Sequence, residues 1–146
     1  MKKTSLSKFV GGLLAAKEPA ANLWHPSDRP YPRLADPVSL DLAGCEGLYA
    51  VWHLGVRPQW LRVGAASDLG GALHALARMP WMVSHQGNTG IYLAWAFPPA
   101  HQYAGMVLHL TQTLKPSFQS ATFGNDLTLD TAASAIVCPL PPGTQS

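Results

Sequence analysis

Two short apolar runs separated by turn-forming residues constrain the fold of this chain more than any other feature. Residues 48–54 place apolar side chains on both faces of an extended segment, and residues 60–64 have the same strand-forming character. Between them lies Gly55-Val56-Arg57-Pro58, which has the composition of a turn. We therefore expect a β-hairpin, because two such runs that flank a short turn form paired antiparallel strands.

Helix and strand patterns alternate after this hairpin. Asp68 can cap a helix that runs to about Arg78, where Pro80 is expected to end it. Residues 86–90 are predicted to form a loop, and residues 91–97 a third strand.

A second helix is predicted after Pro98-Pro99, and it runs to about Leu114. Its apolar residues are spaced four, three and four apart, which places them in one stripe along the helix. The residues of this stripe are Tyr103, Val107, Leu110 and Leu114. The order of elements predicts an α+β fold, in which a small antiparallel sheet (the β-hairpin plus a third strand) packs with helices in a ββαβα core.

The chain is expected to have three parts. Residues 1–46 combine a short N-terminal helix with a Pro-rich arm, whose extended coil carries apolar anchors that would wrap the domain. Residues 47–119 form the α+β core, and residues 120–146 form a C-terminal extension that we expect to be partly disordered. Within this extension, residues 131–137 could form a short helix or an edge strand.

The N-terminus leaves two interpretations open. A basic start followed by the apolar residues 9–16 outlines a cleaved signal peptide. Lys8 directly abuts this run, and Lys17-Glu18-Pro19 follows it at once, which favours a short amphipathic helix and a cytoplasmic protein. The run is also too short to span a bilayer as a helix.

Charged residues are scarce in this sequence. They make up 12% of the chain, and the net charge is +2, whereas about 25% is usual. A dedicated DNA-binding domain has a denser basic face, so the composition favours a protein partner or self-association. The two cysteines, Cys45 and Cys138, lack metal-ligand spacing. We expect reduced thiols, although one long-range disulfide remains an open alternative.

The order of motifs over about residues 47–119 resembles the GIY-YIG nuclease domain. The matching segments are Gly47-Leu48-Tyr49, Trp60-Leu61-Arg62-Val63-Gly64, and Leu114-Lys115-Pro116 with Gln119. This resemblance implies that Tyr49, Arg62 and Gln119 lie near one another on the sheet, as their counterparts do in the family.

Most residues that would perform cleavage in such a domain are missing. The resemblance implies a second tyrosine, a phosphate-binding arginine and a metal-binding glutamate beside Tyr49. Those positions hold Arg62, Ala72 and Val107, with Met106 as the alternative in register. Magnesium prefers oxygen ligands, usually with at least one carboxylate, and residues 102–125 contain no Asp or Glu. We therefore expect no metal site and no cofactor.

The sequence accordingly predicts a non-catalytic, GIY-YIG-like binding module for protein–protein interaction or self-association. The alternative is a divergent nuclease or a nucleic-acid-binding protein that acts on phosphodiester backbones. The candidate binding groove consists of Tyr49, Arg62, Gly64, His74, Arg78 and Gln119, with Tyr49 as the residual catalytic candidate. A carboxylate hidden outside the helices would come from Asp126, Asp130, Asp41 or Glu46. Residues 79–82, which are rich in Met and Trp, are expected to form a partner surface.

Overall fold

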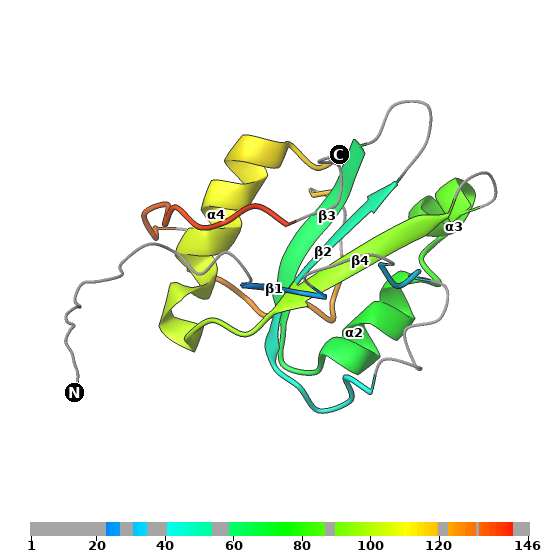
Figure 1. Ribbon diagram of the computed structural model, residues 1–146, viewed down its shortest axis with the longest axis horizontal. Coiled ribbons are helices and arrows are strands. Elements are labelled where there is room, and N and C mark those ends of the chain that lie inside the picture. The colour runs from blue at the N-terminus through cyan, green and yellow to red at the C-terminus, as the bar shows by residue number, and fades with distance from the viewer. Residues whose placement is uncertain are drawn as a thin grey trace, which may run out of the picture.

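The computed structural model describes residues 23–26, 31–34, 41–53, 59–86, 90–119, 123–130 and 132–141. The expected N-terminal helix and the turn at residues 55–58 lie outside these residues. Four strands are β1 (Trp24–His25), β2 (Gly47–His53), β3 (Gln59–Ala66) and β4 (Ile91–Ala96). The helices are α2 (Leu69–Leu76), α3 (Pro80–Gln86) and α4 (Tyr103–Leu114), which follows a short 3₁₀ turn, η3 (Ala100–Gln102). Figure 1 shows their arrangement.

The strands form one antiparallel sheet in the order β1-β4-β2-β3. The α+β prediction is therefore confirmed, and the sheet has one strand more than expected. In the central strand β2, Tyr49 pairs with Gly64 on one side and with Trp95 on the other. This register fixes which side chains of β2 and β3 share a face.

Helices cover both faces of the sheet (Figure 1). On one face α4 packs against alternate residues of β2, namely Leu48, Ala50 and Trp52. On the other face α2 and α3 pack against Tyr49 and Val51. The partly covered strand that the sequence predicted is therefore buried on both sides, which explains why its residues are apolar at successive positions.

The outer edge of β3 is covered by the chain that follows α4. The Phe118 N–H donates to the Leu61 carbonyl at 2.8 Å. The Gln119 side-chain amide accepts from the Val63 N–H at 3.0 Å and donates to the Val63 carbonyl at 2.8 Å, as a neighbouring strand would. Because an unpaired strand edge is a template for association with other chains, these contacts close the sheet on this side.

Two elements differ from the sequence predictions. The Pro-rich arm contains β1, because an extended segment with few donors suits a sheet edge. Its apolar anchor Trp24 is buried, and its indole N–H donates to the Pro139 carbonyl at 2.8 Å. Pro80 was expected to end a helix, but α2 already ends at Leu76, and Pro80 begins α3, since a helix tolerates proline at its first position.

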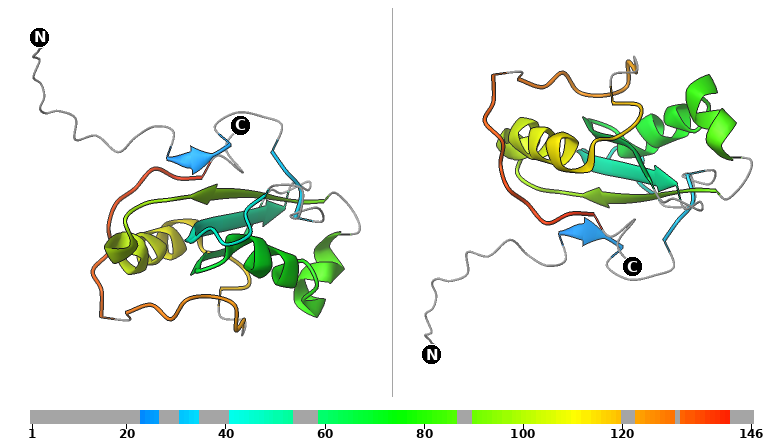
Figure 2. Two further views of the ribbon diagram at one scale, coloured as in Figure 1. Left: turned by 90° about the horizontal axis from the view of Figure 1, so that it is seen from below. Right: turned by 90° about the horizontal axis from the view of Figure 1, so that it is seen from above.

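The C-terminal segment packs on α4 without forming a helix or a strand in residues 132–141. The Ile136 N–H donates to the Gly105 carbonyl at 2.9 Å, and a side chain at Gly105 would collide with Ile136. Figure 2 shows this orange-to-red segment passing beside α4 and returning towards β1. The sequence predicted a short helix or an edge strand over residues 131–137, and neither forms within the described residues. The backbone of Ile136 instead bonds to Gly105 of α4 and not to a strand.

Two further findings concern the cysteines and the membrane. Cys45 and Cys138 are both free thiols, and they belong to the clusters on opposite faces of the sheet. Burial raises the pKa of the Cys138 thiol to about 11. Among the described residues, no helix has the length and apolar character that crossing a membrane requires.

Candidate functional site

Tyr49 and Arg62 share one face of the sheet because of the register between β2 and β3. Tyr49 pairs with Gly64, two residues beyond Arg62, so the two side chains are diagonal neighbours. The Arg62 Nε donates to the Tyr49 hydroxyl at 3.1 Å. Tyr49 is 0% exposed and Arg62 is 5% exposed. Both polar groups therefore depend on partners within the protein.

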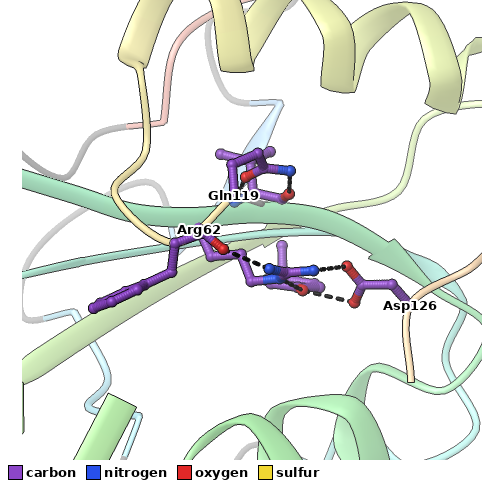
Figure 3. A network of polar contacts seen from close by, with 6 residues as sticks. Arg62, Gln119 and Asp126 are labelled. Atoms are coloured by element: carbon purple, nitrogen blue, oxygen red, sulfur yellow. Dashed lines mark hydrogen bonds and ion pairs between the residues drawn. The ribbon is translucent and has the colours of Figure 1, made fainter. Parts of the chain in front are cut away.

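Asp126 provides the main partner from the chain beyond α4 (Figure 3). The Tyr49 hydroxyl donates to Asp126 Oδ1 at 2.6 Å. The Arg62 Nη2 donates to Asp126 Oδ2 at 3.1 Å, and these groups form an ion pair. We call Tyr49, Arg62 and Asp126 the polar centre. Each of its members contacts the other two, so it is a closed network.

Gly64 leaves the space in which the polar centre forms. A Cβ at this position would lie 2.5 Å from Asp126 Oδ2 and 2.7 Å from the Tyr49 hydroxyl. Contacts this short are not tolerated, so a side chain at position 64 would displace Asp126 or Tyr49. The structure therefore assigns a steric role to this predicted site residue.

Aromatic side chains surround the Arg62 guanidinium. Its Cζ lies 5.8 Å from the centre of the Trp81 ring and 5.5 Å from that of Phe123. The Arg62 Nη1 also donates to the Phe118 carbonyl at 2.7 Å, and the Trp81 and Phe118 rings lie 4.9 Å apart. This cover leaves Arg62 only 5% exposed, and the low local dielectric strengthens its electrostatic interactions.

The environment of the polar centre changes the pKa values of its acids. Burial raises the pKa of the Tyr49 phenol well above its usual value, and the charge of Asp126 adds to this effect, whereas Arg62 opposes it. Burial also raises the pKa of the Asp126 carboxyl, against the lowering effects of Tyr49 and Arg62. Tyr49 is consequently a protonated hydrogen-bond donor at neutral pH, which is a poor state for a nucleophile.

The other predicted site residues have separate locations. Gln119 follows α4, and its side-chain amide binds the backbone of Val63, the residue after Arg62, at the outer edge of β3. His74 is exposed on α2 and lines an open pocket with Asp41 and Asp68. Arg78 is exposed just beyond the end of α2. The contacts of the polar centre therefore join Tyr49, Arg62 and Gly64 of the predicted groove, and the contacts of Gln119 are with the neighbouring residue Val63.

The positions that the resemblance assigned to phosphate and metal binding are buried and apolar. Ala72 packs in the cluster that contains Tyr49, but Val107 and Met106 pack on the opposite face of the sheet. A carboxylate at position 106 or 107 would therefore be separated from Tyr49 by the sheet. Across the described residues, no group of three or more His, Cys, Asp or Glu side chains is arranged to hold a metal ion.

Asp126 is the site residue that sequence reasoning did not place. It contacts Tyr49 across 77 positions and Arg62 across 64 positions, and no periodic pattern surrounds it. The only indication in the sequence was that Asp126 is one of the four carboxylates considered outside the predicted helices.

Comparisons with known proteins gave no match to this chain among family models, curated proteins or solved structures.

We expect a Tyr49→Phe variant to be less sensitive to alkaline pH than the wild-type protein. Because the folded-state pKa of Tyr49 is raised, the stability contributed by its protonated phenol is complete below the unfolded value of 10.0. This contribution is lost as the pH rises through the folded-state pKa. Urea unfolding at about pH 8 and about pH 11 should show a smaller loss of stability in the variant. Equal losses in both proteins would contradict the burial of this phenol.

Proposed function

We propose that this protein is a non-catalytic, GIY-YIG-like binding module that associates with a second copy of itself. The observation that carries the proposal is the closed polar centre. Asp126 of the same chain accepts the hydrogen bond of the Tyr49 hydroxyl and forms the ion pair with Arg62. This arrangement supports a structural role for residues that a nuclease would present to its substrate. A cytoplasmic location, which the N-terminal pattern favours, is part of the proposal.

An uncharged pocket on the α4 side of the sheet supports self-association. Its lining consists of Leu23, Phe97, Pro98, Pro99, Gln102, Met106, Ile136, Val137, Cys138 and Pro139. Phe97 is 49% exposed and Val137 is 74% exposed, although both are large and apolar. Exposed apolar side chains gathered at a pocket are typical of interaction sites.

A second copy is the occupant that fits this surface best. In a twofold dimer the same patch meets itself, so the patch has to be self-complementary. The lining carries no charged side chain, and identical copies therefore meet without repulsion. Phe97 lines this pocket of about 470 Å³, and its ring centre lies 5.8 Å from that of His25. The half of its surface that remains exposed would meet the same patch of the second copy.

The residues 79–82 support a partner surface less well than expected. Met82 is completely buried, and Trp81 packs against Phe118 and Arg62. These side chains stabilise the cover of the polar centre, so we move the proposed interface to the pocket that contains Phe97.

Sedimentation equilibrium tests the proposed association. We expect wild-type dimers, and a Phe97→Ser variant should weaken dimerisation by about tenfold or more, as for a central apolar contact. Val83→Ser is the matched control, because Val83 is 50% exposed but lies on α3 and does not line the pocket. A monomeric wild-type protein, or equal effects of the two substitutions, would contradict the proposal.

A divergent nuclease is the second candidate function, and one observation favours it. The Asp126 carboxylate lies 2.6 Å from the Tyr49 hydroxyl, so an acid is present beside the residual catalytic candidate. The measurement that separates the two functions is a metal-dependent cleavage assay.

A further inference from the structure

The chain segment that carries Asp126 is bound to the sheet in the way that a short peptide is bound to a receptor. Two of its side chains contact the same guanidinium. The Phe123 ring centre lies 5.5 Å from Arg62 Cζ, and Asp126 Oδ2 lies 3.1 Å from Arg62 Nη2. Arg62 thus contacts both the aromatic residue Phe123 and the acidic residue Asp126 three positions later.

Backbone contact with the sheet completes this binding mode. The Leu127 N–H donates to the Ala65 carbonyl of β3 at 2.7 Å. Phe123 is 8% exposed and belongs to the cluster that contains Tyr49. An apolar anchor, a charge-assisted contact and a hydrogen bond to a strand edge are the elements with which domains bind extended peptides.

We propose that the face formed by Tyr49, Arg62 and the edge of β3 is a binding site for acidic peptides of the pattern Phe-x-x-Asp, which residues 123–127 occupy as an internal ligand. A peptide from another protein binds there by displacing this segment. The Asp side chain of the incoming peptide would take the two hydrogen bonds that Asp126 now accepts. Its Phe side chain would replace the ring of Phe123 beside Arg62.

The internal ligand sets the affinity of such a site. When a binding-competent state is populated only in part, the apparent affinity falls by the same fraction. The wild-type protein should therefore bind the peptide more weakly than a variant in which residues 123–127 bind less tightly to this face. This site and the pocket that contains Phe97 lie on opposite faces of the sheet, so the failure of either proposal leaves the other standing.

Fluorescence anisotropy with the full-length protein tests the inference. The probe is a labelled peptide with the sequence of residues 123–130, and the control probe carries Asn in place of Asp at the position of Asp126. The host is the Phe123→Ala/Asp126→Asn variant. We expect it to bind the native peptide at least about tenfold more tightly than the wild-type protein does. The Asn peptide should bind this host at least about tenfold more weakly than the native peptide does.

The following binding results would overturn the inference. Equal binding of the two peptides would show that Arg62 does not read the acid, and no binding to a folded host would show that the face is not a receptor. If the double variant does not fold, the single Asp126→Asn variant serves as host with the same expected order of affinities. Binding of a labelled oligonucleotide to the same host, with no binding of the peptide, would assign the site to phosphate chemistry and would also contradict the inference.

Discussion

An Arg62→Met variant is expected to lose about 3 kcal/mol of its free energy of unfolding. Methionine retains most of the apolar stem, but it removes the ion pair with Asp126, the bond to the Tyr49 hydroxyl and the bond to the Phe118 carbonyl. Loss of one partner from a buried ion pair costs about 3–5 kcal/mol, because the other charge stays without compensation. We expect the lower end of this range, since the Asp126 side chain is 16% exposed to solvent, which weakens the ion pair.

Urea unfolding of this variant measures the loss directly. Arg78→Met is the matched control, because Arg78 is exposed beyond α2, and it should change stability by no more than about 0.5 kcal/mol. If both substitutions have the same small effect, the polar centre does not stabilise the fold.

The second large effect is expected at Val107. A Val107→Glu variant should lose roughly 2–5 kcal/mol, because Val107 is 8% exposed within the cluster between α4 and the sheet. The glutamate cannot reach the polar centre, which lies on the opposite face of the sheet. It therefore has no cationic partner there to offset the cost of burial.

Thermal or urea unfolding can separate this effect from a change in helix propensity. Thr113→Glu is the control, since Thr113 is an exposed β-branched residue on the same helix. A stable Val107→Glu protein would show that this face of α4 is open to solvent, and it would contradict the predicted and observed stripe of the helix.

Regular patterns in the sequence predicted much of this fold. The apolar runs of β2 and β3 predicted a hairpin. The resemblance in motif order predicted that Tyr49 and Arg62 lie close together, and the hairpin register makes them diagonal neighbours. The spacing within residues 103–114 likewise predicted the buried stripe of α4, of which Tyr103, Val107 and Leu110 are buried.

The rest depended on contacts that have no local pattern. Asp126 lies in an aperiodic segment, and its place depends on the space that Gly64 leaves between distant strands. The short strand β1 has only two residues, too few for a period to be visible. α3 was missed because a proline that follows a helix can mark its end or begin another helix, and Pro80 begins α3 after α2 has ended at Leu76.

The central claim is that the polar centre is a closed structural network and not a catalytic site. A cleavage assay on single-stranded and double-stranded DNA and RNA, with magnesium or manganese, tests it most directly, with Tyr49→Phe as the control. Three features lead us to expect no turnover above background. Tyr49 is buried and protonated, Asp126 is paired with Arg62, and the proposed resemblance would place a phosphate-binding arginine at the position that Ala72 occupies. Removing one electrostatic contact to the transition state typically costs about 10²–10³ in rate. Metal-dependent cleavage by the wild-type protein that is lost in Tyr49→Phe would contradict the account and identify Asp126 as the missing carboxylate.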